Sequence, residues 1–209
     1  VAGYGLFIAC AECADYGFYT VFNPVLRILD DIKGPKTITY YLTLPIPQYQ
    51  VFLSLAVATF IELLTIAALL LPITKVILQS RFDVSRVAWG QTAAIFICAY
   101  LFYASLVLFS TSLIHGVENF NNFYIRIRDS LYWFGCAMFT WQRLYDKNHL
   151  LAYIDLLNPF TYACEGMRAA ILRDPHAISV WYCCGALLVF TAACGSIGLH
   201  QMMKKLDCL

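Results

Sequence analysis

Three long stretches without any Asp, Glu, Lys or Arg limit what this chain can fold into more than any other feature. They cover residues 37–61, 87–117 and 175–203, with 25, 31 and 29 residues. A helix needs about 20 mainly apolar residues to cross the roughly 30 Å of hydrocarbon in a bilayer. The sequence therefore predicts a helical integral membrane protein.

The charge content agrees with this prediction. Only 13% of the 209 residues are charged, whereas ordinary soluble domains have roughly 25%. The mean hydropathy is +0.67 and the formal net charge is +1. These values argue against a soluble enzyme, a disordered chain and a nucleic-acid-binding protein. No segment alternates apolar and polar residues long enough for a membrane barrel.

Prolines and charges set the expected limits of the spans. Pro45 and Pro47 delay the second helix to about residue 50, and it continues past Glu62 until Pro72 ends it. We expect an all-α polytopic bundle in a single transmembrane domain, 1–209, with about five spans. The expected spans are about 1–22, 50–72, 88–113, 123–141 and 178–200. Lys and Arg residues divide seven to seven between the two sets of loops, so they do not orient the chain.

Three carboxylates fall inside these spans. Glu12 and Asp15 are three residues apart and share a helix face, and Glu62 lies in the middle of the second span. Ionisable groups within a membrane are costly and are functional candidates. They either line a transport pathway, or face other helices and accept hydrogen bonds from Ser, Thr or Tyr side chains, or are protonated.

The sequence offers no pattern for enzyme chemistry. It contains no P-loop for a nucleotide and no paired histidines for zinc. Cys10 and Cys13 form a Cys-x-x-Cys pair in an apolar helix without a nearby His, and buried cysteines behave as small apolar residues. We expect no metal site, no bound cofactor and no catalytic residue in this chain.

Two loops mix charged and apolar residues. Residues 28–47 can form a short amphipathic helix on the membrane surface or on a partner, or a simple linker, before Pro-Ile-Pro turns the chain. Asn158-Pro159 is typical of a helix start. The helix that follows, about 159–172, is too short to span and contains Glu165 and Arg168. With residues 150–157 it predicts two short interfacial or re-entrant helices.

The order of these features resembles the permease subunit of type-2 ATP-binding-cassette (ABC) transporters, an exporter family. Residues 1–5, Val-Ala-Gly-Tyr-Gly, resemble the opening of that family's second span, and residues 34–47 resemble the cytoplasmic segment before its third span. The best match is 157–172, where Asn158, Pro159, Tyr162 and Arg168 have the family's spacing. Gly135 and Phe139 stand where the family often has Gly followed by aromatic residues.

The resemblance implies a topology. Family members have six spans with both termini in the cytoplasm, so this chain would lack the first span. Its C-terminus would be cytoplasmic, in the plasma membrane or a bacterial inner membrane. The resemblance also implies a homodimer or heterodimer of permeases in the lipid bilayer. Each permease would dock a separate P-loop ATPase subunit that holds ATP and Mg.

The resemblance also assigns roles to the two loops. Loop 27–49 would couple the permease to the ATPase, and the short segment 114–122 would make a second contact. The coupling residues would be Asp30, Asp31, Lys33, Gly34, Lys36 and Pro45. Residues 150–172 would form an external hairpin that either gates the exit or packs in the outer leaflet. Its residues are Asn158, Pro159, Tyr162, Glu165 and Arg168, the last two as a local ion pair.

Two other functions remain open at this stage. The chain could belong to a secondary transporter in which Glu12, Asp15 and Glu62 form a proton path. It could also be a membrane assembly or anchor protein without transport activity.

Overall fold

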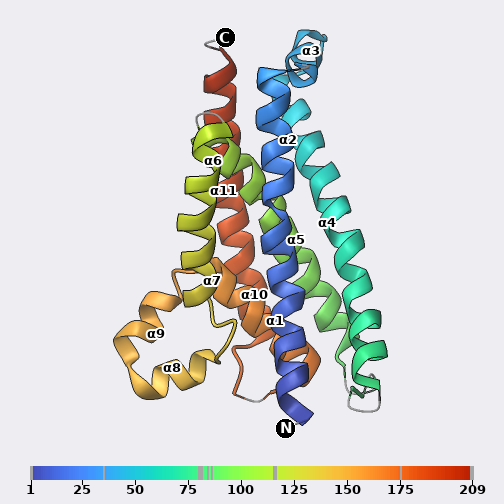
Figure 1. Ribbon diagram of the computed structural model, residues 1–209, viewed down its shortest axis with the longest axis vertical. Helices are drawn as coiled ribbons and strands as arrows, with labels where there is room; N and C mark the ends of the chain where they lie inside the picture. The colour runs from blue at the N-terminus through green and yellow to red at the C-terminus, as the bar shows by residue number, and fades with distance from the viewer. Residues whose placement is uncertain are drawn as a thin grey trace.

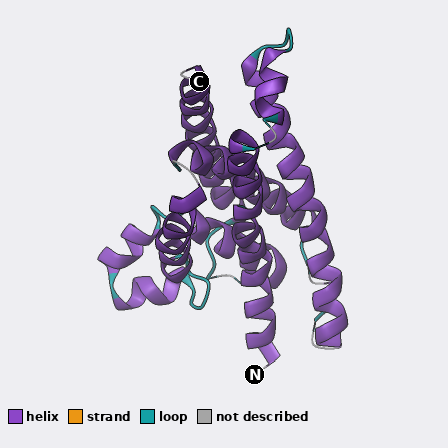
Figure 2. Cartoon of the chain, turned by 45° about the horizontal axis from the view of Figure 1, so that its top comes forward, coloured by secondary structure: helices purple, strands orange, loops and turns teal. Residues whose placement is uncertain are grey.

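A computed structural model describes residues 2–34, 36–79, 82–83, 85, 87–114, 117–174 and 176–207, and over these residues the fold is helical with no strand (Figures 1 and 2). The elements are α1 (Ala2–Thr20), α2 (Phe22–Lys33), α3 (Thr37–Thr43), α4 (Gln48–Leu78), α5 (Trp89–Leu113), α6 (Val117–Tyr124), a π-helical segment (Ile125–Asp129), α7 (Ser130–Phe134), α8 (Trp141–Lys147), α9 (His149–Asp155), α10 (Pro159–Leu172) and α11 (Val180–Asp207). The expected all-α class is confirmed.

Three helices are long and apolar enough to cross a membrane, namely α4, α5 and residues Val180–Lys204 of α11. This finding indicates a membrane protein. The three helices differ in burial. In their most apolar parts, 67% of the residues of α5 are buried, against 17% in α4 and 22% in α11. The most buried of the three, α5, therefore lies at the centre of the bundle.

The first helix is longer than the expected span 1–22. Val21 only briefly separates α1 from α2, and its N–H still donates to the Gly17 carbonyl at 3.2 Å. The prediction of a loop from residue 23 is wrong, because the helix runs on to Lys33. Pro24 lies in the first turn of α2, where its missing N–H costs little. Burial of Val25 and of later apolar residues of α2 stabilises the extension.

The second span also extends beyond its expected range of 50–72. Pro47 precedes α4, as the Pro-Ile-Pro signal indicated. Pro72 does not end the helix, however, and α4 continues to Leu78. A proline within a helix removes one hydrogen bond and can be tolerated in a long apolar helix. Pro72 is exposed, so its ring does not crowd the neighbouring helices.

The expected span 123–141 is wrong at both ends. Helical structure begins at Val117, passes through the π-helical segment and stops at Phe134. A β-carbon at Gly135 would lie 2.3 Å from the Phe160 ring and 2.5 Å from the Leu131 carbonyl oxygen. Cys136 has φ of 55°, which turns the chain away from the helix axis. Residues 135–140, called the connector below, therefore lead to α8, a helix that the sequence did not predict.

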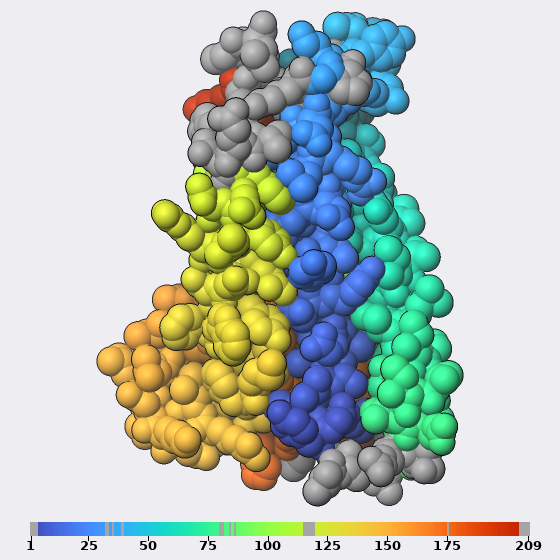
Figure 3. Space-filling model, viewed as in Figure 1, coloured from blue at the N-terminus to red at the C-terminus, as the bar shows by residue number. Residues whose placement is uncertain are grey.

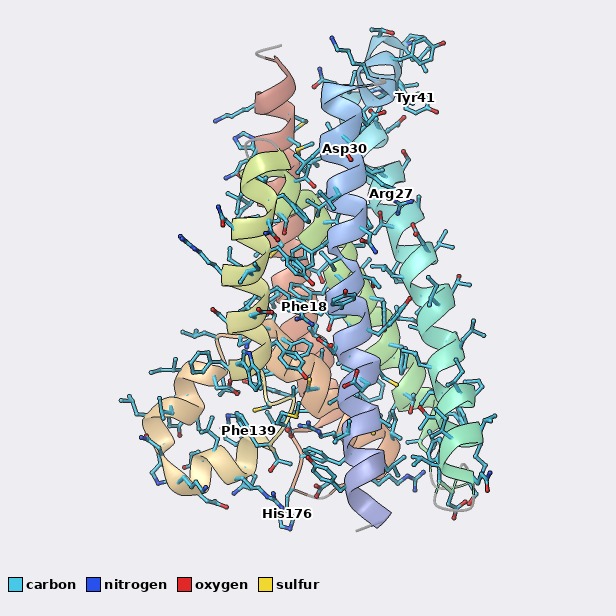
Figure 4. The ribbon with its side chains drawn as sticks, viewed as in Figure 1. Phe18, Arg27, Asp30, Tyr41, Phe139 and His176 are labelled. Carbon is cyan, nitrogen blue, oxygen red and sulfur yellow. The ribbon has the colours of Figure 1, made fainter. Side chains whose placement is uncertain are left out.

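Close contacts hold the central helices together. A β-carbon at Gly198 of α11 would lie 2.7 Å from the backbone N of Phe109 in α5, so these two helices touch through backbone atoms. Tyr100 of α5 donates from its hydroxyl to the Cys13 carbonyl at 2.7 Å, which ties α5 to α1. Phe18 lies midway along the bundle in Figure 4, buried against Tyr103 and Phe160.

The two ends of the molecule carry different short helices. Figure 1 shows α3 and the C-terminal end of α11 at the upper end, and the N-terminus of α1 with α8 and α9 at the lower end. Of the two possibilities left open for 28–47, the structure shows a short helix, α3, and the two short helices expected in 150–172 are present as α9 and α10. They occupy opposite ends of the bundle.

Candidate functional site

Asp31 fixes the turn between α2 and α3. Its carboxylate accepts hydrogen bonds from the backbone N–H groups of Thr37, at 3.1 Å, and Ile38, at 2.7 Å. Burial raises the pKa of Asp31, but the hydrogen bonds from Ile38 and Thr37 favour the charged form and together bring the net pKa below its usual value. Asp31 thus acts as a structural tie at the start of α3.

The other predicted coupling residues lie at the same end. Asp30, Gly34, Lys36 and Pro45 are exposed, and Lys36 adopts the left-handed conformation with φ of 58°. Lys33 ends α2, but its side chain lies outside the described residues. Asp30 and Tyr41 are both labelled at this end in Figure 4.

Large apolar and aromatic side chains also project from this end. We call them the α3 surface: Tyr40, Tyr41, Leu44, Ile46 and Tyr49, each between 37% and 62% exposed. Exposed apolar groups gathered in this way are typical of an interaction surface. The second predicted contact, 114–122, is described only in part. Residues 115 and 116 lie outside the description, and Phe120 is buried against Phe22.

At the opposite end, the Asn158-Pro159 signal forms the helix start that the sequence predicted. The Asn158 side-chain oxygen accepts from the Phe160 N–H at 3.0 Å, and Pro159 opens α10. The Asn158 amide also donates to the Leu131 carbonyl of α7 at 2.7 Å. Tyr162 donates to the Leu156 carbonyl at 2.8 Å. These residues therefore hold the hairpin in shape and attach it to α7.

Glu165 and Arg168 form an ion pair of 3.0 Å with almost no exposed surface. Arg168 also donates to two connector carbonyls, Ala137 at 2.6 Å and Phe139 at 3.0 Å. Glu165 accepts from the Trp141 N–H at the start of α8 at 3.1 Å. The pair thus holds the non-helical connector against α10. The sequence indicated the pair by its spacing, but not these connections.

Asp155 is a second buried carboxylate in this region, and the sequence did not point to it. Asp155 accepts from the Cys136 thiol at 3.0 Å and from the Thr161 hydroxyl at 3.1 Å. None of the described ion pairs includes Asp155. Burial raises the pKa of Asp155, and the hydrogen bonds from Cys136 and Thr161 offset part of that rise. No local sequence signal marks it, because its partner Cys136 is 19 residues away.

The three carboxylates of the spans lie in different surroundings. Glu12 is exposed on α1. Asp15 lies 3.5 Å from Arg128, in the π-helical segment. Glu62 pairs with Arg27 at 2.7 Å on the outside of the bundle, with side chains 47% and 62% exposed. The structure therefore pairs two of the carboxylates with separate arginines and does not gather the three around one site.

Arg128 is a further residue that sequence reasoning did not single out. Its guanidinium carbon lies 5.1 to 5.9 Å from the ring centres of Tyr19, Tyr124 and Tyr132. Aromatic faces stabilise a cation in such positions, and π-helical segments are frequent at functional sites. The one sequence feature that could have identified Arg128 is the presence of an arginine inside the expected span 123–141.

Among the described residues, no group of three or more His, Cys, Asp or Glu side chains is placed to hold a metal ion. Cys10 and Cys13 are both buried in α1 as free thiols. No family model, no curated protein and no solved structure matches this chain.

Proposed function

We propose that this chain is the permease subunit of an ATP-driven exporter of the type-2 ABC class, with ATP hydrolysed by a separate P-loop subunit. One observation carries the proposal most directly. An exposed apolar α3 surface lies at one end of a bundle of long apolar helices, and a tightly tied group of short helices, α8 to α10, lies at the other. This is the arrangement that a permease with a coupling segment and an external hairpin would need.

In this proposal the bundle crosses the membrane five times. The spans lie within the α1–α2 rod, α4, α5, the rod from α6 to α7, and α11, and the end of α2 that carries Asp31 lies outside the membrane. The α3 end faces the cytoplasm together with the C-terminus. The α8 to α10 end is external, and α10 is a re-entrant helix whose ends bond to α7 and the connector.

The links around α3 are suited to transmit movement. Asp31 ties α3 to α2, and the Pro45 turn joins α3 to α4. A push on the α3 surface by the ATPase would therefore reach both long helices. At the external end, Arg168 joins α10 to the connector. A movement of α1 or α7 would therefore be transmitted to the hairpin.

A second permease copy, or a related permease, completes the transporter in this proposal. Glu12 is exposed on α1. In the proposed topology α1 is part of a span, and charges that face hydrocarbon are costly. Figure 3 shows α1 and the rod from α6 to α7 side by side on one face of the molecule. We assign this face to the partner permease.

Purification of the full-length tagged protein from its native membrane tests the proposal. We expect a P-loop ATPase to co-purify, and Tyr41→Arg in the α3 surface to reduce its recovery at least fivefold. Leu157→Arg is the matched control, because Leu157 is 74% exposed at the opposite end. Recovery of the ATPase with Leu157→Arg should equal that of the unmodified protein.

Other outcomes would contradict the proposal. Absence of any ATPase from the purified protein removes its main support. Transport that needs no ATP and is abolished by Glu62→Gln would indicate a secondary transporter. An intact complex in which deletion of the chain changes no transport process would indicate an assembly or anchor protein.

A further inference from the structure

A cavity at the α8 end of the molecule takes no part in the proposed coupling. We call it the α8 pocket. Its volume is about 610 Å³, within the range of small-molecule sites. Its walls come from α1, the connector, α8 and the segment before α11. The lining residues used below are Tyr4, Phe7, Arg143, Asp146, Asp174 and His176. His176 marks this end of the molecule in Figure 4.

Two aromatic rings form one wall of the pocket. Tyr4 and Phe7 stack with 6.5 Å between ring centres and 11° between ring planes. Phe7 is also covered by the Arg168 guanidinium, with 3.9 Å between Cζ and the ring centre. Because Arg168 is itself fixed by the connector, the Phe7 ring is held in place.

The pocket also contains charged groups of both signs. Asp146 accepts from the Gln142 side chain at 3.0 Å, and Asp174 accepts from the His176 N–H at 2.9 Å, so both carboxylates are positioned. Arg143 also lines the pocket. None of the ion pairs between described residues includes Arg143, Asp146 or Asp174.

The mixture of charges selects the ligand. A wholly apolar ligand would cover three charged groups without neutralising any of their charges. A multiply charged anion would meet Asp146 and Asp174, and a simple cation would leave Arg143 unused. We propose that the α8 pocket binds a zwitterion with an ammonium group and a phosphate or carboxylate. Asp146, Asp174 and the Tyr4 face would receive the ammonium group, and Arg143 would bind the anionic group through its planar donors.

This chemistry has two sources at a membrane surface, a phosphoethanolamine lipid headgroup or a soluble zwitterion. Either would enter at the end of the bundle that carries the charged α8. The inference does not depend on the proposed ATP-driven export, because it rests only on the lining of the pocket. A failure of the ATPase test would leave it unaffected.

Titration of the full-length protein in nanodiscs with three matched probes tests the proposal. Phosphoethanolamine carries both a positive and a negative group. Glycerol 3-phosphate carries only the negative group, and ethanolamine carries only the positive group. We expect phosphoethanolamine to bind at least tenfold more tightly than either of the others. Arg143→Gln should lower its affinity about tenfold, and Arg143→Lys should lower it less. Lys147→Gln, also in α8 but outside the pocket, should leave it unchanged.

Nanodiscs of two compositions identify the source. If the headgroup is the natural ligand, the phosphoethanolamine probe will bind more weakly in phosphatidylethanolamine discs than in phosphatidylglycerol discs. If a soluble zwitterion is the ligand, both discs will give the same affinity. Equal binding of the three probes, binding of none, or unchanged affinity in Arg143→Gln would overturn the proposal. Arg143 is exposed, so the variant will fold, as its unfolding temperature will show.

Discussion

Arg168 of α10 stacks on Phe7 of α1, with its guanidinium carbon 3.9 Å from the centre of the ring. The same guanidinium pairs with Glu165 and donates to the Ala137 and Phe139 carbonyls. One side chain thus joins α1, α10 and the connector. Several contacts that hold the α8 end together therefore depend on this one arginine.

Arg168→Met should destabilise the protein strongly, because Glu165 would remain buried without its cation. Removal of one partner from a buried ion pair costs about 3–5 kcal/mol. Denaturant unfolding in detergent micelles, followed by near-UV circular dichroism, measures this loss. Arg173→Met is the control at an exposed arginine and should change stability by less than about 0.5 kcal/mol. The double variant Glu165→Met with Arg168→Met should recover part of the loss. Equal instability of the single and double variants would disprove this role for the pair.

Gly198→Ala should separate α5 from α11, because the new β-carbon would meet the Phe109 backbone at 2.7 Å. Overpacking of this kind costs about 1–3 kcal/mol. Gly185 lies in the same helix, and a β-carbon added there would meet no neighbouring atom within 4 Å, so Gly185→Ala is the matched control. It should keep or slightly raise the unfolding temperature, since alanine favours helices. Similar unfolding temperatures for the two variants would show that the helices do not cross at Gly198.

The raised pKa of Asp155 predicts that the hairpin is more stable in acid. Burial raises this pKa above that of an unfolded aspartate, about 3.9. The protonated form is therefore favoured in the folded state, and stability falls as pH rises from about 4 through the raised pKa. Unfolding temperatures of the protein and of Asp155→Asn, measured between about pH 4 and 8, test this. The unmodified protein should lose stability relative to the variant over this range. Parallel profiles would contradict it.

The lowered pKa of Asp31 predicts the opposite pH dependence at the α3 end. Its charged form accepts the Thr37 and Ile38 N–H groups, so this stabilisation is present above about pH 4 and lost as pH falls through the lowered pKa. Amide hydrogen exchange at Thr37 and Ile38 is the readout. Asp31→Ala should speed exchange at both amides at neutral pH, while Asp30→Ala, at an exposed neighbour, should not. Slow exchange of both amides in Asp31→Ala would mean that α3 forms without this tie.

Much of the fold could be predicted from the sequence because it depends on long apolar runs. Those runs located α4, α5 and α11 to within a few residues at most ends. Two of the errors lie at prolines. Pro24 was compatible with a helix start and Pro72 with a helix interior, and only packing distinguishes these cases from a helix end. The end of α7 at Gly135 was also hidden, because it depends on the distant Phe160 ring.

The candidate site shows the same division between local and distant causes. Asn158-Pro159 is a local signal, and it forms the predicted helix start. The Glu165–Arg168 spacing likewise gave the ion pair. The connector carbonyls that bind Arg168 are 29 and 31 residues away. The thiol of Cys136 that donates to Asp155 is 19 residues away, and Tyr19 and Arg128 are much further apart along the chain. Spacing along the chain carries no information about such contacts.

The length of α4 has a consequence for how the protein responds to its bilayer. Its 31 residues make a rod of about 46 Å at 1.5 Å per residue, well beyond the roughly 30 Å of a hydrocarbon core. A long helix adapts to a thin membrane by tilting, and α4 is mostly free to do so because few of its residues are buried. The neighbouring α5 is held by protein on most sides. Since α4 continues through a short turn into α3, a change in membrane thickness would reorient α3 while the centre of the bundle stayed in place.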